Sequence, residues 1–370
     1  MSKKVWLILL SAMLLGGCGG EKNNVVKLAV VSPLTGDVAA MGQGMKRGVD
    51  MAVDEANAAK VLGDKTIVME AFDDRADPKE AVNAANRIIS DRRILGVIGH
   101  LNSGCSIPAS QIYAKRNLVM ISPASTNPKL TLQGLKNVFR VCTTDDVQGS
   151  QAADFAVQTL NAKRMAVIHD KTAYGQGLAE NFQKRAQELQ AEVTGFDGID
   201  IGDKDFKALL TAIKTKQPEL IYFGGMYTEG GLLTKQAKEL GLNMPLLAGD
   251  GSYTPEYIKI GGKSSEGDYV TTMGVNPEDL PLAKGFLERF KVRYPGVDMQ
   301  PYDLYSYEAA NLLIAALAEA KLDPTKIPAT VAGINYAGIL GTTKFDQNGD
   351  TLNKTISIYQ VKDGKYAFVK

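Results

Sequence analysis

The sequence predicts an α/β fold with two doubly wound, parallel-sheet lobes. Short runs rich in β-branched residues alternate with longer amphipathic segments, a rhythm that is typical of βαβ units. The rhythm starts near residue 25 and restarts near residue 146, which predicts two units of about 120 residues each. A chain of 370 residues, with 45% hydrophobic and 22% charged residues, is long enough for both units to bury substantial cores.

The first unit is predicted between residues 25 and 121. Its helix at 78–91 has Pro78 in the first turn and apolar residues at helical spacing. The alternation of elements predicts a parallel sheet with helices on both faces. Strands are expected at 25–31, 66–72, 95–98 and 118–121, and helices at 42–60, 78–91 and 106–116.

The second unit is predicted to begin with a helix at 146–160. The C-terminal third is expected to return to the first unit, and the last strand, 356–362, is expected to join the second. No linker rich in Pro, Gly or Ser separates the units, which predicts short crossovers. Further strands are expected at 164–169, 192–198, 219–223 and 245–248, and helices at 175–190, 204–216, 229–240, 280–293 and 302–320.

The first 24 residues are predicted to be a targeting segment and a tether, not part of the fold. Two lysines precede an apolar run at 5–15, which is too short for a membrane span and typical of a secretory signal. The run ends in Leu-Gly-Gly-Cys at 15–18, a pattern that resembles the bacterial lipobox, although a plain signal peptide with an incidental cysteine is the alternative. We therefore predict a signal peptide at 1–17, a lipidated Cys18 and a polar tether at 18–24.

Composition argues against several classes of function. The net charge is +1 and no basic stripe with interleaved aromatic residues occurs, so nucleic-acid binding is not expected. We find no nucleophile elbow and no phosphate-binding loop, so we expect neither an enzyme nor a cofactor. His100 and His169 each end a predicted strand and are expected to be structural or rim residues. Two histidines and three cysteines do not form a zinc pattern, and we expect Cys105 and Cys142 to be small buried hydrophobes.

Polar residues follow several predicted strands, where α/β proteins bind ligands. Ser103 follows strand 95–98, and Ser122-Pro-Ala-Ser-Thr126 follows strand 118–121. Hydroxyls and accessible backbone in such loops can hold a carboxylate without a cationic side chain. Ordinary helix capping by Ser103 and Thr126 is the alternative at this point.

An acidic side chain follows a strand of the second unit. Asp250 lies between Gly249 and Gly251 after strand 245–248, where we expect its carboxylate to be exposed on the cleft side and able to pair with an ammonium group. The alternative is an ordinary turn aspartate. Asp170, after strand 164–169, is a second acidic candidate.

Six segments resemble the leucine/isoleucine/valine-binding protein family, which comprises type I periplasmic binding proteins of branched-chain amino acid ABC transporters. The resemblance covers residues 25 to 365. It implies two lobes linked by three crossovers near 143–145, 272–275 and 347–352, with lobe one at 25–143 plus 274–348 and lobe two at 144–273 plus 349–370. The segments are AVVSPLTG at 29–36, AFDDRADPK at 71–79, VIGHLNSGCSIPASQIY at 97–113, VMISPASTNPKLT at 119–131, VIHDKTAYGQGL at 167–178 and GFDGIDIGDKDF at 195–206.

The resemblance also assigns roles to residues. It implies that Ser103, Ala124 and Thr126 hold a ligand carboxylate and that Asp250 holds the ammonium. Tyr174 is implied to face the cleft. The remaining expected wall residues are Met41 and Met226, which replace aromatic residues of relatives, and Tyr302.

The resemblance implies no disulfide at the place where some relatives have one, because Ala76 and Asn102 occupy those positions. A bond between Cys105 and Cys142 remains open. The implied function is that of a monomeric lipoprotein in the periplasm or at the cell surface. It would bind an aliphatic L-amino acid such as leucine, isoleucine or valine and deliver it to an ABC permease. The alternatives are another small amino acid, an amide or a carboxylate as ligand, and a role as a sensor.

Overall fold

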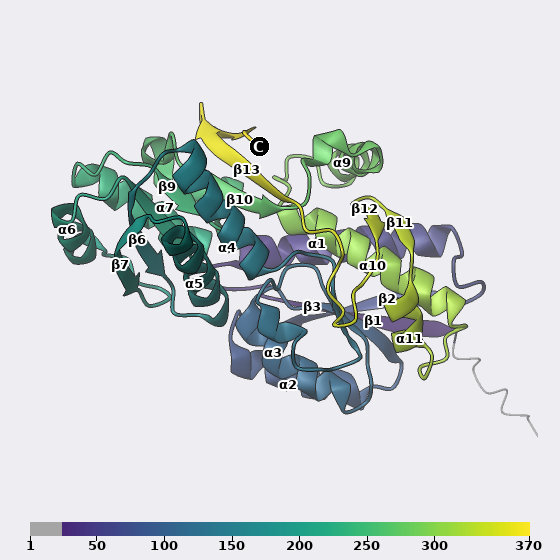
Figure 1. Cartoon of the computed structure of the whole chain (residues 1–370). Coiled ribbons are helices and arrows are strands. Elements are labelled where there is room, and N and C mark those ends of the chain that lie inside the picture. The colour runs from purple at the N-terminus through teal and green to yellow at the C-terminus, as the bar shows by residue number, and fades with distance from the viewer. Residues whose placement is uncertain (1–23) are drawn as a thin grey trace, which may run out of the picture.

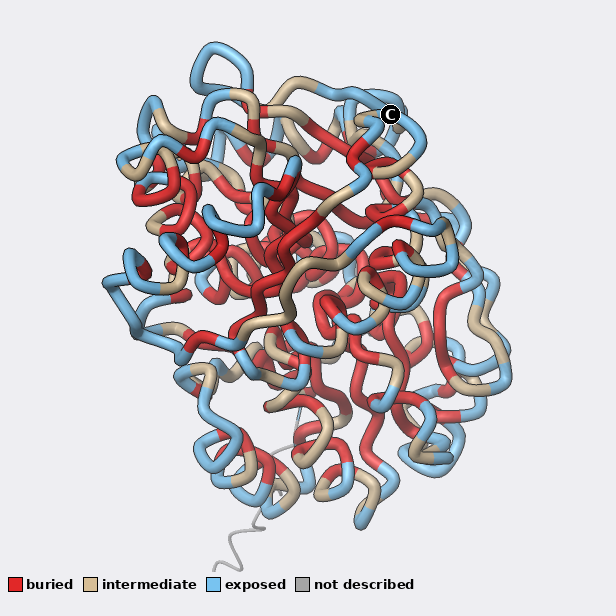
Figure 2. The backbone as a smooth tube through the Cα atoms, turned by 60° about the vertical axis from the view of Figure 1, so that its left-hand side comes forward, coloured by how far each residue is buried: buried red, intermediate tan, exposed pale blue. Residues whose placement is uncertain are grey.

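The computed structural model describes residues 24–370, and within them the chain forms two α/β lobes (Figure 1). Lobe one is the first sheet with its helices, and lobe two is the second. The predicted signal peptide and lipidated Cys18 lie outside the described residues. Buried segments fill the interior of both lobes, and exposed segments form the outer turns (Figure 2).

The first sheet has five parallel strands in the order β2-β1-β3-β4-β5. The order reverses between β1 and β3, which makes their carboxyl ends the switch point where α/β proteins bind ligands. The strands are β1 (Val25–Ser32), β2 (Thr66–Asp73), β3 (Ile94–Gly99), β4 (Met120–Ser122) and β5 (Val138–Arg140), and the helices are α1 (Ala39–Ala58), α2 (Pro78–Ser90) and α3 (Ser103–Ala114).

The second sheet has seven strands in the order β14-β13-β10-β9-β8-β6-β7. Five are parallel, whereas β13 runs antiparallel to β10 and β14 antiparallel to β13. The prediction that strand 356–362 joins the second sheet is therefore confirmed. The strands are β6 (Arg164–His169), β7 (Glu192–Gly198), β8 (Leu220–Gly224), β9 (Leu246–Ala248), β10 (Tyr269–Met273), β13 (Ile356–Lys362) and β14 (Lys365–Phe368). The helices are α4 (Asp145–Asp154), which continues as a π-helix (Phe155–Thr159), α5 (Ala173–Glu188), α6 (Lys207–Thr215), α7 (Tyr227–Glu239) and α8 (Pro255–Gly261).

The chain returns to lobe one through α10, which packs closely against α1. A Cβ at Gly48 would lie 2.1 Å from the Asp303 carbonyl oxygen, so only glycine allows this approach. Arg47 on α1 forms two hydrogen bonds of 2.9 Å to the Asp303 carboxylate. The elements of this segment are α9 (Pro281–Arg293), α10 (Pro301–Glu319), α11 (Ile327–Gly333), β11 (Tyr336–Gly338) and β12 (Gly341–Thr343).

A buried arginine at the end of β5 binds a residue of the segment between β12 and β13. The Arg140 side chain is fully buried, and its Nε donates to Asp350 at 2.5 Å. Its two terminal nitrogens donate to the carbonyl oxygens of Ser125 and Asn127 and to the Thr131 hydroxyl. The guanidinium is thus paired and well hydrogen-bonded, which is the condition for burying a charge at tolerable cost.

A second buried charge connects α10 with the β11–β12 hairpin. Glu308 is 1% exposed and accepts hydrogen bonds from the Ile339 amide at 2.8 Å and the Thr343 hydroxyl at 3.2 Å. Burial raises the pKa of Glu308 to about 7, against 4.5 for an ordinary glutamate. The folded protein therefore binds a proton between these pH values that the unfolded chain releases.

The Glu308→Gln variant should remove a pH dependence of stability. Since the folded-state pKa is the higher one, wild-type stability falls as the pH rises from about 4.5 to 7, by roughly 3 kcal/mol from this group. Urea unfolding at several pH values should show a flatter profile for Glu308→Gln. Glu319→Gln, an exposed glutamate of the same helix, is the matched control. Parallel pH profiles for wild type and Glu308→Gln would contradict the assignment.

Within the part of the chain that the structure describes, no helix is long and apolar enough to cross a membrane.

Candidate functional site

The candidate site centres on Asp250, which begins a 3-10 turn directly after β9. Tyr174 of lobe two donates its hydroxyl to Asp250 Oδ1 at 2.8 Å, and Tyr302 of lobe one donates to Oδ2 at 2.6 Å. The carboxylate is therefore held from both lobes at once. The structure brings together three of the residues that the sequence predicted.

Asp250 is 2% exposed, so its carboxylate is buried between the lobes and is not open to solvent on the cleft side. The two lobes close over this side chain, and a strand end that looks open in sequence is covered by α10. Burial raises the pKa of Asp250, and the hydroxyls of Tyr302 and Tyr174 and the nearby Gln148 amide oppose that rise. A buried carboxylate whose two partners are neutral lacks a counter-ion and will attract a cation.

Glycine is required on both sides of Asp250 because the neighbouring side chains lie so close. A Cβ at Gly249 would come within 2.8 Å of the Tyr174 hydroxyl. A Cβ at Gly251 would come within 2.9 Å of the Met226 sulfur and of the Tyr174 ring. Tyr174 and Met226 thus pack directly against the turn that carries the carboxylate, which supports their predicted positions.

Ser103, Ala124 and Thr126 lie at the carboxyl ends of β3 and β4. Ser103 is the first residue of α3, whose N-cap is Asn102, and the Ser103 hydroxyl accepts from the Asn127 amide at 3.2 Å. The Thr126 hydroxyl is buried without a hydrogen-bond partner among the described residues. Neither hydroxyl caps a helix, so the capping alternative is wrong for both.

Met41 is fully buried on α1, within the same large hydrophobic cluster as Tyr174, Met226 and Tyr302. Burial of an apolar side chain in this cluster fits a core residue as well as a wall of the site. The predicted contact of Met41 with a ligand therefore stays a prediction.

Asp145 and Gln148 are candidate site residues that the sequence analysis missed. Both lie on α4 and are fully buried, and neither the carboxylate oxygens nor the amide atoms form a hydrogen bond of regular geometry among residues 24–370. The Gln148 amide lies beside the Asp250 carboxylate, and the Thr126 hydroxyl lies beside that of Asp145. Burial raises the pKa of Asp145 well above its usual value, and the nearby Asp250 adds to the rise. The Thr126 hydroxyl, which lies beside the Asp145 carboxyl without a hydrogen bond of regular geometry, lowers this pKa and so opposes the rise. Asp145 therefore lies between the two halves of the predicted site.

Buried polar groups without partners mark where a polar ligand fits. Each such group costs about 1–3 kcal/mol when it stays unpaired. Around Asp250 these groups are the Thr126 hydroxyl, the Asp145 carboxylate, the Gln148 amide and the Tyr222 hydroxyl. They offer acceptors for a cation and donors for an anion, which matches a zwitterion.

The other singled-out polar residues have structural roles. His100 is fully buried, with Nδ1 2.7 Å from Asp74 Oδ2 and Nε2 3.0 Å from the Tyr113 hydroxyl. His169 Nδ1 accepts from the Lys171 amide. These contacts confirm that both histidines are structural.

Asp170 is not part of the acidic cluster around Asp250. Its Oδ1 accepts from the amide and hydroxyl of Thr172, the residue that precedes α5. Burial raises the pKa of Asp170 to about 6. These contacts make it a buried turn aspartate, and Asp250 is the better ammonium candidate.

Cys105 and Cys142 are both free and buried, so the open possibility of a bond between them is wrong. They behave as the small hydrophobes that the sequence predicted, and burial raises the pKa of the Cys142 thiol to about 12. Among the described residues no group of three or more His, Cys, Asp or Glu side chains could hold a metal ion.

Comparisons with known proteins bear on the fold and the family of this chain. A family model described as periplasmic binding protein matches residues 25–365. The Leu/Ile/Val-binding protein homolog 2 of Brucella abortus is 36% identical over 355 residues, which cover 95% of each chain.

Solved structures match over the same range. A leucine-binding protein from Thermotoga maritima superimposes with a TM-score of 0.87 and 35% identity, covering 93% of this chain and 98% of that one. A branched-chain amino acid transporter substrate-binding protein from Streptococcus pneumoniae, solved with isoleucine, gives 0.87 and 26%, covering 94% and 99%. A solute-binding protein from R. palustris in complex with benzoate shares the fold, with a TM-score of 0.85, 20% identity, and coverage of 93% and 95%. These matches confirm the type I periplasmic binding protein fold, and the chain belongs to the leucine/isoleucine/valine-binding protein family.

Proposed function

We propose that this protein is an extracytoplasmic receptor that binds an aliphatic L-amino acid between its lobes and delivers it to an ABC permease. The observation that carries the proposal is the buried Asp250 carboxylate, which is held by Tyr174 of one lobe and Tyr302 of the other and has no cationic partner among residues 24–370. An α-ammonium group supplies the missing charge. The Thermotoga maritima relative is named a leucine-binding protein and the Streptococcus pneumoniae relative was solved with isoleucine, which supports this ligand class.

The two charged ends of the ligand have separate partners in this proposal. The ammonium lies between Asp250 and Asp145, where two negative potentials add. The carboxylate lies against Ser103, Ala124 and Thr126, where backbone amides and hydroxyls at the start of α3 and after β4 can donate. A zwitterion thereby satisfies groups that are otherwise buried and unpaired.

Closure of the lobes follows because the two charged ends of the ligand are bound by different lobes. Lobe one supplies the carboxylate partners and lobe two supplies Asp250, so a ligand that bridges both favours the closed arrangement. The hydrogen bond from Asn127 of lobe one to the Ala173 carbonyl of lobe two, at 2.5 Å, belongs to that arrangement. The hydrogen bond from the Tyr227 hydroxyl to the Asp37 carbonyl, at 2.8 Å, also spans the lobes.

The ligand side chain is proposed to be aliphatic. Met226 packs beside the Asp250 turn, and Met41 is the predicted wall from lobe one. Methionine is flexible and apolar, so it adapts to leucine, isoleucine or valine without selecting strongly among them. Micromolar affinity requires about −8 kcal/mol, which a few charge-assisted hydrogen bonds and one buried aliphatic side chain can supply.

The wider context is part of the same proposal. The lobes are bounded at 25–143 plus 274–348 and 144–273 plus 349–370, and the protein is a monomer without catalytic activity. Lipidation at Cys18 anchors the protein to a membrane. From there the protein delivers its ligand to the permease. Retention in the detergent phase after expression, lost in Cys18→Ala, tests the anchor.

A ligand screen tests the proposal. Thermal shifts over the amino acids, their amides and small carboxylates such as benzoate should show stabilisation by leucine, isoleucine or valine, and calorimetry should give their affinities. Binding of carboxylates alone would contradict the role of Asp250 and favour the alternative ligand class. Gene neighbours that encode a kinase and no permease would favour a sensor.

Ser103→Ala should weaken leucine binding about tenfold, because one hydrogen bond to the ligand carboxylate is lost and the Asn127 amide loses its acceptor. The measurement is calorimetric titration. Ser110→Ala is the control, since Ser110 is buried on the same helix, donates to the Ile107 carbonyl and accepts from the Gln133 amide, and none of these groups belongs to the proposed site. Equal affinities for the two variants would remove Ser103 from the site.

A further inference from the structure

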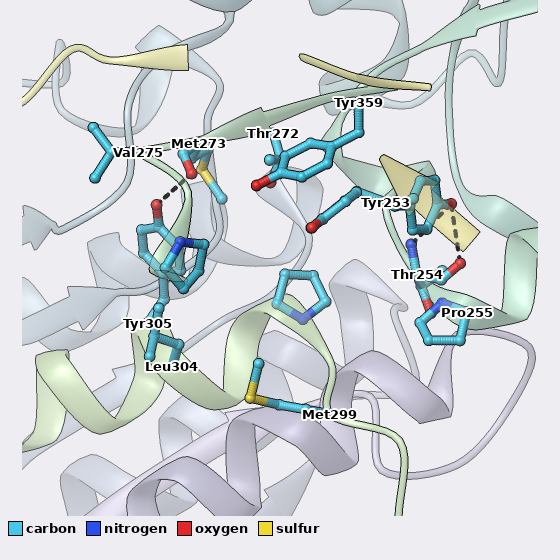
Figure 3. Close-up of a pocket in the computed structure, with 13 residues that line it drawn as sticks. Tyr253, Thr254, Pro255, Thr272, Met273, Val275, Met299, Leu304, Tyr305 and Tyr359 are labelled. Atoms are coloured by element: carbon cyan, nitrogen blue, oxygen red, sulfur yellow. Dashed lines mark hydrogen bonds between the residues drawn. The ribbon is translucent and has the colours of Figure 1, made fainter. Parts of the chain in front are cut away.

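A cavity of about 150 Å³ lies between the lobes at a place that the proposed amino-acid site does not use (Figure 3). Lobe two supplies Thr272 and Met273 from β10, Tyr359 from β13 and the neighbouring Tyr253. Lobe one supplies Met299 and the first turn of α10, including Leu304. Every residue proposed to hold the amino acid lies outside this lining.

The lining determines the charge of an occupant. It consists of tyrosine, threonine, proline, methionine, valine and leucine side chains, and it contains no ionisable group other than tyrosine. An ammonium or carboxylate placed here would lose its hydration without gaining a partner. The cavity therefore excludes the zwitterion of the main site and accepts a neutral molecule.

The size and the aromatic walls determine its shape. A dry cavity near 150 Å³ holds about one six-membered ring. The Tyr253 ring lies 4.8 Å from the Tyr359 ring and 4.7 Å from the Tyr366 ring, so a continuous aromatic wall forms one side. Met299 and Leu304 lie on the other side (Figure 3). Aromatic rings and methionine sulfur are favourable contacts for another aromatic ring.

A buried hydroxyl of the lining, that of Tyr359, is available to an occupant. The hydroxyl of Tyr305 donates to the Met273 carbonyl and that of Tyr366 to the Ser252 carbonyl. The Tyr359 hydroxyl, on a side chain that is 5% exposed, forms no hydrogen bond of regular geometry among residues 24–370, and the Tyr253 hydroxyl is its polar neighbour. It can serve one hydrogen-bonding group of an occupant.

We propose that this cavity is a second ligand site, which takes a small neutral aromatic molecule with one hydrogen-bonding group and thereby stabilises the closed lobes. Its walls come from both lobes, so their separation would dismantle it. An occupant and a cleft ligand that both require the closed arrangement increase each other's affinity. This site goes beyond the proposed amino-acid function.

Phenol is the probe for the test. The sample is the protein without its predicted signal peptide and lipidated cysteine, residues 24–370. Ligand-observed NMR and calorimetry should show saturable phenol binding that leucine does not displace. Saturating leucine should tighten phenol binding about fivefold. Absence of saturable binding, or displacement of phenol by leucine, would overturn the proposal. Failure of leucine itself to bind would instead overturn the proposed function and leave the phenol titration interpretable.

Two variants locate the bound phenol. Met299→Trp should abolish its binding by filling the cavity, and partial exposure of Met299 favours tolerance of the larger ring. Tyr359→Phe keeps the wall but removes the hydroxyl, so it should weaken phenol about fivefold and leave benzene unchanged. Tyr336→Phe on β11 is the control. Wild-type phenol affinity in both Met299→Trp and Tyr359→Phe would place phenol elsewhere and sink the proposal.

Discussion

Asp250→Asn is expected to abolish amino-acid binding, with at least a 100-fold loss of affinity in calorimetry. The variant keeps the shape of the side chain but removes the charge that pairs with the ligand ammonium. Loss of one partner from a buried charge pair costs about 2–5 kcal/mol, which exceeds the effect of a lost neutral hydrogen bond. Tyr302→Phe should lose less, because it removes only one of the two hydroxyls that hold the carboxylate.

The same variant should not destabilise the ligand-free protein. Burial raises the pKa of Asp250, so its ionisation above pH 3.8 opposes folding, and an asparagine removes that penalty at neutral pH. Thermal melts should therefore show an unchanged or higher Tm without ligand and no further rise with leucine. Asp200→Asn, an exposed acid of lobe two, is the control and should behave as wild type. Retained leucine affinity in Asp250→Asn would refute the assignment.

Much of the fold was predictable because the long elements carry strong periodic signals. The α2 helix starts at Asp77, whose carboxylate accepts from the Lys79 and Glu80 amides, and Pro78 follows it. This cap and the helical spacing of apolar residues are both local in sequence, so 78–91 was located to within one residue at its end.

The missed elements are short or depend on distant partners. β5 has three residues and β10 has five, and neither shows a pattern until its sheet neighbours are known. In the sheet, β10 lies between β9 and β13. Along the sequence, β9 and β13 are far apart, because α9 and α10 both lie between them. Tertiary pairing of this kind leaves no periodic signal in one segment.

The residues of the candidate site also fall into those that the sequence predicts and those that it does not. Ser103 and Asp250 follow strands, so the rule that ligands bind at carboxyl ends of strands identifies them. Asp145 follows β5, which was itself missed, and in sequence it resembles an ordinary acidic residue in the first turn of a helix. Only the absence of a partner for a fully buried carboxylate reveals it, and burial is not visible in one sequence.

Asp145→Asn is expected to weaken leucine binding at least tenfold and to raise the stability of the ligand-free protein. Both effects have one cause: a second carboxylate close to Asp250, which attracts the ammonium but opposes folding when it is ionised and unpaired. Because the pKa of Asp145 is raised, the ligand-free protein keeps this carboxyl protonated at pH values where an ordinary aspartate is ionised. An arriving ammonium favours the ionised form, so binding should release protons, and affinity should fall as the pH falls through the raised range.

Calorimetry in two buffers of different ionisation enthalpy measures that proton release. Wild type should release protons when leucine binds, and Asp145→Asn should release fewer and show a flatter dependence of affinity on pH. Asp146→Asn, the neighbouring acid on α4, is the matched control, because Asp146 is exposed while Asp145 is fully buried. If Asp145→Asn instead kept both wild-type affinity and wild-type proton release, the ammonium would rest on Asp250 alone, and the unpaired Asp145 carboxyl would have to be neutral in both states.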